Sequence, residues 1–269
     1  MKATEARVLL TGASGGIGQA MARLLADAGA QVMGVGRHPA APGGSAMAWT
    51  CADLTHSDGP AAVAQAAAEW QANVLVHAAG VPAFGALADT DPARMQLLLY
   101  TNLLAPMQLT QAMLPQLRRL PRAQVVFVGS ALGRIGLPGF SVYGASKAGL
   151  HGFAEALRRE LADTTVKVQT LAPRSTRTGF NGAAVEAFNR ATGTAMDSPD
   201  VVAAALLALI ENEAAERFMG FPERLGVRLN GLLGAWMDGS FAKHRHSLLS
   251  TRPSDIAPTL NTHTGGTRP

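Results

Sequence analysis

The chain has 269 residues, of which 48% are apolar and 16% are charged, and its formal net charge is +4. A chain of this length and composition can bury a large core, which argues against a disordered protein, and its basic residues are too dispersed for a nucleic-acid interface. The single cysteine, Cys51, excludes an internal disulfide and a cysteine-based zinc site, and no metal site is predicted.

Short apolar segments alternate with alanine- and leucine-rich segments of helical periodicity along the chain. Strands that alternate with helices indicate βαβ units and a parallel sheet. We therefore predict an α/β fold with a single-domain, doubly wound parallel sheet flanked by helices. The apolar segments of strand length are residues 8–11, 31–35, 74–77, 124–128 and 166–171.

A glycine-rich turn follows the first predicted strand and passes directly into a helix that begins near Ile17. Glycines let the backbone approach a pyrophosphate closely, and a helix N-terminus supplies free N–H groups and a favourable dipole. The turn lacks the Gly-Lys-Ser/Thr ending of a nucleoside-triphosphate loop. It therefore predicts a dinucleotide site, with an ordinary surface turn as the alternative. The candidate contacts are Gly12, Ser14, Gly16, Ile17 and Gly18.

Arg37 follows the second predicted strand, where an acidic residue would normally bind the hydroxyls of an unphosphorylated ribose. A guanidinium there can pair with a 2′-phosphate, so the sequence favours NADP(H), with NAD(H) and a solvated Arg37 as the alternative. Asp53 follows a third short strand and is placed to meet an adenine amino group, with Leu54 beside the ring. A turn or helix cap is the alternative role for Asp53.

Two helix starts are readable in the middle and later parts of the chain. Asp91 and Pro92 predict the first turn of a long helix that ends near Pro115, and Ser198 and Pro199 predict the start of another helix.

Tyr143 and Lys147 are one helical turn apart, and Ser130 lies thirteen residues before Tyr143. On a helix, residues i and i+4 share a face. A phenol has an unperturbed pKa of about 10, and a neighbouring cation favours the phenolate. The pair therefore predicts a tyrosine with a lowered pKa that acts as a general acid–base, with a solvated helix face as the alternative.

The last part of the chain holds two further predicted segments. Residues 174–198 form a polar connection after a strand, which predicts a substrate loop rather than an ordinary surface loop. Residues 223–242 predict an apolar C-terminal helix that packs against the body or a second subunit, or alternatively lines a lipophilic entrance or touches a membrane. Residues 250–269 predict a disordered tail, so the domain spans residues 1–249.

Together, these motifs resemble those of the classical short-chain dehydrogenase/reductase family over about residues 5–220. The resemblance implies a Rossmann-type fold, a nicotinamide cofactor and interconversion of a carbonyl and an alcohol. Residues 77–80 look like the family's Asn-Asn-Ala-Gly motif, which adds Ala79 and Gly80 to the cofactor contacts. Thr176 and Thr178 match partners of the nicotinamide carboxamide and the pyrophosphate.

The resemblance also assigns four catalytic roles. Ser130 would hydrogen-bond the substrate oxygen, and Tyr143 would transfer the proton. Lys147 would bind the nicotinamide ribose and lower the pKa of Tyr143. Asn102 would hold a water that links Lys147 to solvent.

The chain departs from the family pattern at two places. His77 and Ala78 stand where the family carries two asparagines, so we expect His77 to be structural and the sheet around Ala78 to be supported differently. Arg174 stands where the family commonly has glycine, and we expect its side chain to point outward, with contact to an acidic substrate group as the alternative.

We therefore predict an NADP(H)-dependent oxidoreductase that acts on a lipophilic substrate as a homodimer or homotetramer. The sequence has no signal-peptide-like segment and no apolar run of about 18 residues, and we therefore predict a cytoplasmic protein without a transmembrane segment.

Three alternatives stay open from the sequence. One is a cofactor-binding regulatory or scaffold protein of the same fold without turnover. Another is a serine hydrolase built from Ser130, His151 and Asp163, although Ser130 lacks the flanking glycines of a nucleophile elbow and His151 is expected to face elsewhere or lie on the helix surface. The third is an epimerase or dehydratase on the same fold.

Overall fold

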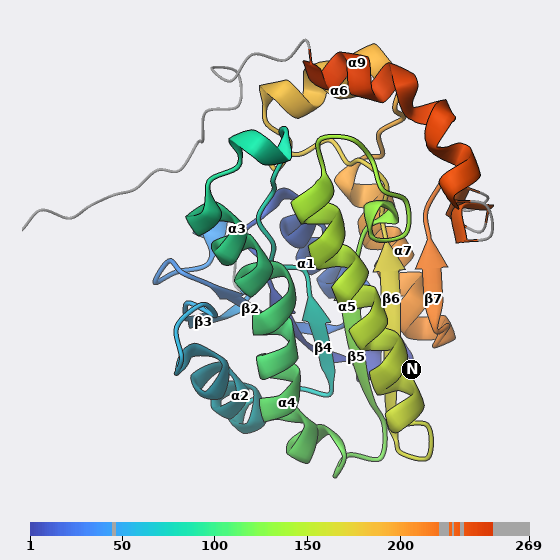
Figure 1. The fold of residues 1–269 in the computed structure, drawn as a ribbon. Coiled ribbons are helices and arrows are strands. Elements are labelled where there is room, and N and C mark those ends of the chain that lie inside the picture. Colours follow the sequence, from blue (N-terminus) through green and yellow to red (C-terminus); the bar gives the residue numbers. More distant parts are fainter. Residues whose placement is uncertain (45–46, 221–225, 228, 232–233, 250–269) are drawn as a thin grey trace, which may run out of the picture.

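The protein is described from a computed structural model, which places residues 1–44, 47–220, 226–227, 229–231 and 234–249. Its described residues form a seven-stranded sheet in the order β3-β2-β1-β4-β5-β6-β7, and every strand pairing is parallel (Figure 1). The predicted doubly wound α/β fold is confirmed. The strands are β1 Arg7–Thr11, β2 Gln31–Gly36, β3 Ala48–Cys51, β4 Val74–His77, β5 Ala123–Val128, β6 Val166–Ala172 and β7 Glu216–Phe218.

The strand order reverses at β1, which pairs with β2 on one side and with β4 on the other. Thr11, the last residue of β1, stands opposite Val35 of β2 and His77 of β4. In an open parallel sheet, such a reversal leaves a crevice beyond the carboxyl ends of the strands, and ligands bind there. The turn after β1 and the loop after β4 both lie at this end of the sheet.

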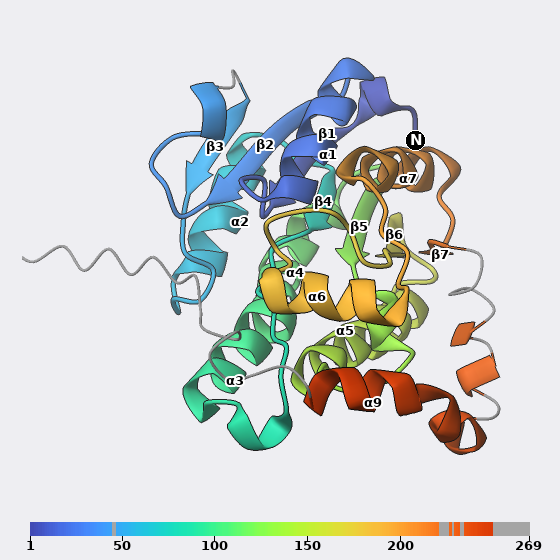
Figure 2. The same ribbon diagram turned by 90° about the horizontal axis from the view of Figure 1, so that it is seen from above.

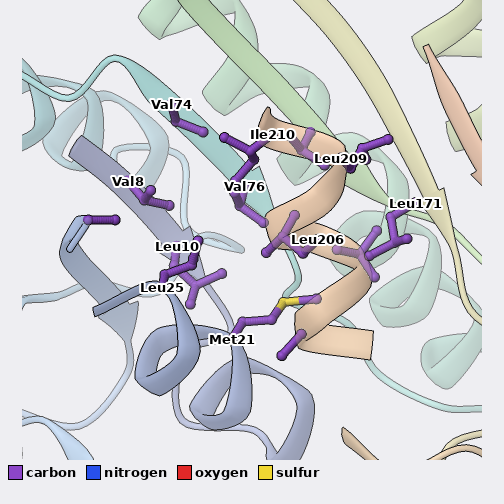
Figure 3. Close-up of a cluster of buried hydrophobic side chains, with 14 of the residues drawn as sticks. Val8, Leu10, Met21, Leu25, Val74, Val76, Leu171, Leu206, Leu209 and Ile210 are labelled. Carbon is purple, nitrogen blue, oxygen red and sulfur yellow. The ribbon is translucent and has the colours of Figure 1, made fainter. Parts of the chain in front are cut away.

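Helices cover both faces of the sheet because its buried strands present apolar side chains to both. Val8 and Leu10 of β1 join one core cluster, whereas Leu9 between them joins the other. Figure 3 shows the first cluster, in which Met21 of α1 and Leu206 of α7 pack beside these strands. The helices on this face are α1 Gly16–Asp27 and α7 Pro199–Asn212, and those packed on the opposite face are α2 Gly59–Glu69, α4 Ala105–Leu117 and α5 Ser141–Glu160.

Two further helices lie beyond the carboxyl ends of the strands. These are α6 (Ala183–Thr192) and α9 (Ala242–Leu249), and they contact each other over α5 (Figures 1 and 2). They cover the end of the sheet where the candidate site residues were predicted. Short 3-10 helices complete the described structure at Ala3–Glu5, Pro42–Gly44, Leu87–Asp89, Ala131–Gly133 and Gly234–Phe241.

The predicted helix start at Asp91 is confirmed, but the helix is interrupted. The Asp91 side chain accepts a hydrogen bond of 3.0 Å from the Ala93 N–H. The chain then forms α3 (Pro92–Leu99), a π-helical turn at Tyr100–Leu104, and α4, which contains Pro115 near its end. Pro106 has no N–H for an α-helical hydrogen bond to residue 102, which explains the wide turn before it. Ser198 also caps α7 as predicted, with its hydroxyl accepting from the Val201 N–H at 3.4 Å.

The later segments differ from expectation in part. The predicted substrate loop contains a helix, α6, that the sequence analysis did not anticipate. Of the predicted C-terminal helix, residues 223–225, 228 and 232–233 lie outside the described residues, and Gly234–Phe241 form a 3-10 helix instead of an α-helix. The predicted tail, residues 250–269, also lies outside them. Among the helices that are described, none is long and apolar enough to cross a membrane.

Candidate active site

Tyr143, Lys147 and Ser130 lie together at the carboxyl end of β5. Helix α5 begins at Ser141, so its first two turns carry Tyr143 and Lys147. The Ser130 side chain lies close enough to the Tyr143 hydroxyl to act on the pKa of the phenol. Lys147 is buried, donates from Nζ to the Val128 carbonyl at 2.9 Å, and lies 5.9 Å from the centre of the Tyr143 ring. The constellation expected from the sequence is therefore assembled in space.

The protonation of this pair differs from expectation. Burial raises the pKa of Tyr143 to about 12, against a smaller lowering by the Ser130 side chain. Burial also lowers the pKa of Lys147 to about 8. The expected net lowering of the Tyr143 pKa is therefore wrong for this structure, because loss of hydration dominates at both groups. Near neutral pH, the phenol is protonated and can donate a proton.

Asn102 lies in the π-helical turn and ties two parts of the site together. Its side chain accepts from the Val81 N–H at 2.8 Å and donates to the Val81 carbonyl at 3.0 Å. Its amide nitrogen is also 3.3 Å from the hydroxyl of Ser146, the residue before Lys147. The side chain thus anchors the loop after β4 to α5, and its contact with a catalytic water stays a prediction.

The turn after β1 is so closely packed that two of its glycines are required. Gly12 has a φ of +69°, and a Cβ atom there would lie 2.6 Å from the Ala79 nitrogen. A Cβ atom on Gly18 would lie 2.1 Å from the Gly12 carbonyl oxygen. No described side chain caps the N-terminus of α1 at Gly15, and residues 14–16 are exposed. This helix N-terminus fits a pyrophosphate, because its amides are open and no side chain blocks them.

The loop after β4 joins this turn to the Tyr143 site. Ala79 lies against Gly12, whereas a Cβ atom on the next residue, Gly80, would lie 3.2 Å from Asn102 Oδ1 and 3.9 Å from Lys147 Nζ. Thr178 approaches the turn from the opposite side, with its methyl group 2.9 Å from a Cβ atom placed on Gly16. A dinucleotide bound at the turn would thus lie close to Thr178 and could extend past Gly80 toward Lys147.

The end of β2 lies beside the glycine-rich turn. A Cβ atom on Gly36 would lie 3.7 Å from the Ser14 hydroxyl, and exposed Arg37 follows at once. Asp53 accepts from the backbone and the hydroxyl of Thr55 at 2.9 and 2.7 Å, which matches the turn-cap alternative. Burial acts to raise the pKa of Asp53, but these hydrogen bonds and the charge of Arg37 outweigh it and lower the pKa.

The remaining predicted cofactor residues are held by the protein itself. Thr176 is buried and donates from its hydroxyl to the Arg174 carbonyl at 3.1 Å. Ile17 and Leu54 are partly buried against the two core clusters. Ile17 belongs to the glycine-rich turn, whereas the described contacts do not bring Thr176 and Leu54 to it, and the roles of all three toward a cofactor stay predictions.

His77 is a buried part of the sheet. Its Nε2 atom lies 2.8 Å from the Thr110 hydroxyl, and its ring stacks on Phe127 with 4.9 Å between centroids. Burial lowers its pKa to about 3, so the ring is neutral. The Thr11 hydroxyl accepts from the N–H groups of Ala78 and Ala79 at 3.1 and 3.2 Å, which supplies the different support expected there.

The expectation that Arg174 points outward is wrong. Its guanidinium lies 2.6 Å from the Asp197 carboxylate, and the two side chains are only 22% and 11% exposed. The Asp197 N–H also donates to the Ser175 carbonyl at 2.9 Å, and the Arg177 N–H donates to the Asp197 carbonyl at 2.9 Å. An arginine, unlike glycine, can thus join the two ends of the 174–198 loop by a charge-assisted hydrogen bond.

His151 faces Phe218 of β7 and not Ser130, as the first of its two expected placements predicts, but the second placement, on the helix surface, is wrong. The ring is 2% exposed and stacks on Phe218 of β7, with 5.4 Å between centroids. Neither of its nitrogens has a hydrogen-bond partner among the described residues, Ser130 included. A Ser130–His151 catalytic pair is therefore not present.

Aromatic residues that the sequence analysis missed surround the Tyr143 site. Phe180 is 37% exposed and meets the Tyr143 ring edge-on at 6.1 Å between centroids. Phe188 of α6 packs on Phe84, Phe140 and His244, at centroid distances of 5.1, 5.7 and 5.7 Å. These residues come from four separate segments, so no local sequence pattern could have grouped them.

Comparisons with known proteins agree with this geometry. A family model described as short chain dehydrogenase matches residues 6–188. Among similar proteins is a ketoacyl reductase, HetN, from Nostoc sp., which is 33% identical over 226 residues that cover 79% of this chain and 78% of the relative.

Two solved structures share the fold. One is a short chain dehydrogenase from Burkholderia cenocepacia in complex with NADP, with a TM-score of 0.78, 22% identity, and coverage of 90% of this chain and 99% of that one. The other is a short chain dehydrogenase/reductase from Burkholderia phymatum in complex with NAD, with a TM-score of 0.78, 20% identity, and coverage of 88% and 97%.

Proposed function

Because the chain belongs to the short-chain dehydrogenase family, and is thereby an NAD(P)-binding oxidoreductase of CH–OH and C=O groups, we propose that Tyr143 is its acid–base and NADP(H) its cofactor. The physiological reaction would be reduction of a lipophilic ketone or aldehyde to the alcohol. The observation that carries this proposal is that Ser130 and buried Lys147 both lie beside Tyr143.

The two hydroxyls of Ser130 and Tyr143 offer a pair of donors to one carbonyl oxygen. Reduction places negative charge on that oxygen, and fixed donors stabilise such charge where it develops. The bound nicotinamide would supply the hydride to the carbonyl carbon. Tyr143 then gives its proton to the substrate oxygen. Because its pKa is about 12, the phenol keeps this proton until the substrate oxygen becomes basic.

The positive charge of Lys147 acts on the protonation of the Tyr143 phenol. Its ammonium group lies 5.9 Å from the centre of the Tyr143 ring and has a pKa of about 8, so it is mainly charged at neutral pH. A cation at this place favours the tyrosinate that forms when the proton leaves. Asn102 fixes the loop that carries Gly80 against Lys147, which keeps the ammonium in position.

The preference for NADP(H) rests on Arg37. Its exposed guanidinium follows β2 beside the glycine-rich turn, and it acts electrostatically on Asp53. An Arg–phosphate hydrogen bond would add affinity that an unphosphorylated ribose cannot gain.

Arg37→Ala is expected to weaken NADPH binding by about tenfold and NADH binding by less than about twofold, because only NADPH loses a charge-assisted contact. Fluorescence titration of both cofactors measures this. Arg159→Ala, which removes an exposed arginine at the far end of α5, is the matched control. An unchanged NADPH/NADH preference in Arg37→Ala would refute the assignment of the cofactor.

The lipophilic substrate is proposed from the surroundings of Tyr143 and from the HetN relative. Phe180 presents an exposed apolar ring beside the phenol, and α6, which covers the same end of the sheet, carries Phe188 packed on Phe84 and Phe140. Burial of apolar surface contributes about 0.8 kcal/mol per CH₂ group, so affinity should grow with chain length.

The proposed function is tested by NADPH oxidation across a chain-length series of ketones and aldehydes. We expect kcat/KM to rise with the length of the apolar chain, and Phe180→Ala to reduce that rise by about tenfold for the longest members. Phe180→Leu, which keeps an apolar side chain, is the matched control. A higher kcat/KM for short polar carbonyls would contradict the lipophilic assignment.

We also propose that the enzyme is a homo-oligomer. Leu97, Leu99 and Leu104 are each about two-fifths exposed on α3 and the π-helical turn that follows it. Neighbouring exposed leucines on one helical segment are typical of a surface that a second subunit covers.

A further inference from the structure

A cavity lies at β7, one of the two edge strands of the sheet, whose place in the fold Figure 1 shows. It has a volume of about 990 Å³, and Ser130, Tyr143 and Lys147 are not among its lining residues. We call it the β7 pocket. Its walls come from the loop after β5, the loop after β6, helix α7 and β7 itself, and Val227 and Gly231 of the segment after β7 also line it.

Three arginines from three different elements line the β7 pocket. Arg174 is already paired with Asp197 at 2.6 Å. Arg134 donates a hydrogen bond of 3.4 Å to Glu155 and lies 3.7 Å from Glu216, which leaves other N–H groups of its guanidinium for a ligand. Arg217 is exposed and makes no ion pair with any residue that the structure describes. The pocket therefore keeps cationic hydrogen-bond donors available for an anion.

His151 lies behind the wall of this pocket, next to the lining residue Glu216, and has unpartnered polar atoms. Its side chain is 1% exposed, and its Nδ1 atom faces the Glu216 carboxylate of the pocket wall at 3.7 Å, which is too long for a hydrogen bond. Both ring nitrogens are without partners in the described part of the chain. Buried polar atoms are normally hydrogen-bonded, so an additional polar group is expected between His151 and Glu216.

The same pocket also has an apolar side. Val201 and Ala205 of α7 line it, together with Phe218 and Met219 at the end of β7. Val201 is 49% exposed, although large apolar side chains gain free energy by burial. A ligand with both an anionic and an apolar part would satisfy the two sides together.

We propose that the β7 pocket binds an anionic amphiphile, whose phosphate or carboxylate head pairs with Arg217 and Arg134 and whose apolar chain lies on Val201. This site is separate from the proposed reaction and does not depend on it. One hydrogen bond connects the pocket to the reaction site, because the Gly133 N–H on its wall donates to the Ser130 carbonyl at 3.0 Å.

The test is calorimetric titration of the full chain, without cofactor, with dodecyl phosphate below its micelle concentration. We expect saturable binding that Arg217→Gln and Arg134→Gln each weaken by about tenfold, since each removes charge-assisted hydrogen bonds. Inorganic phosphate alone should bind more weakly, and Val201→Ser should reduce the advantage of the dodecyl chain. Dodecanoate replaces dodecyl phosphate in a further arm to separate a carboxylate head from a phosphate head.

Two controls keep the result specific to the β7 pocket. Arg159→Gln removes an exposed arginine elsewhere, and Arg37→Ala removes the proposed cofactor phosphate contact, so both should leave binding unchanged. Thermal unfolding of Arg217→Gln should match the unmodified chain, because the side chain is exposed. The proposal is overturned if binding is lost in Arg37→Ala but kept in Arg217→Gln, if dodecanol binds equally well, or if no saturable binding occurs.

Discussion

Replacement of Tyr143 by phenylalanine is expected to lower kcat by about 10² to 10⁴-fold while cofactor affinity stays within about threefold, which is the range that loss of a general acid produces. Phenylalanine keeps the ring that packs against Phe180 and Lys147 but removes the hydroxyl beside Ser130. Steady-state cofactor oxidation gives kcat, and fluorescence titration gives the dissociation constant.

The chain offers a matched control in its only other tyrosine, Tyr100. Its hydroxyl donates to Gln108 at 3.0 Å, so Tyr100→Phe also removes one partly buried hydrogen bond. That variant should keep its kcat within about threefold, since the lost bond is worth only about 1 kcal/mol of stability. Equal kcat values for Tyr143→Phe and the unmodified enzyme would show that another group moves the proton.

A methyl group on Gly18 is expected to weaken cofactor binding by at least about 100-fold, or about 2.7 kcal/mol. The added carbon would stand 2.1 Å from the Gly12 carbonyl oxygen, which is backbone and cannot rotate away. The turn must shift to accept it, and overpacking of this kind typically costs about 1–3 kcal/mol. Titration of Gly18→Ala with NADPH and NADH measures the effect.

Gly152→Ala is the control for this substitution. Gly152 lies in α5, and a Cβ atom there would meet nothing within 4 Å. Alanine should stabilise that helix by about 0.5–1 kcal/mol and leave cofactor binding unchanged. Circular dichroism separates a displaced turn from an unfolded sheet in Gly18→Ala. A folded Gly18→Ala protein with unchanged affinity would place the cofactor elsewhere.

The fold could be read from the sequence where strands are long and buried. The runs that became β1, β2, β4, β5 and β6 are apolar because both faces of a parallel sheet are covered by helices. Strand β7 escaped prediction because it has only three residues, Glu216–Phe218, two of them charged. As an edge strand it exposes these side chains to solvent and lacks the apolar run of its neighbours.

Helix α6 escaped prediction for a different reason. It follows polar and glycine residues, and its start at Gly182 has no side-chain cap among the described contacts. Its stability comes from long-range packing, with Phe188 buried against Phe84 and Phe140. Such contacts join residues about 50 and 100 positions apart, which a local pattern does not reveal.

The candidate site was predictable where its function depends on backbone or on short spacing. The glycine-rich turn could be recognised because its closely packed positions accept only glycine. Tyr143 and Lys147 could be recognised because they are separated by one helical turn. The protonation of Tyr143 was not predictable, because burial is a property of the whole fold. The partners of Arg174 and His151, which are Asp197 and Phe218, could likewise not be predicted. They come next to these residues only when the edge of the sheet is folded.

The central claim is that this site transfers hydride to a carbonyl with Tyr143 as the acid. It is tested most directly with NADPH deuterated at the transferable C4 position and a long-chain ketone, with mass spectrometry of the alcohol. We predict one deuterium at the carbinol carbon with the unmodified enzyme, formed 10² to 10⁴-fold more slowly by Tyr143→Phe. Tight NADPH binding by the unmodified chain without any deuterated alcohol, across the whole carbonyl series, would contradict the claim and favour a cofactor-binding protein without turnover.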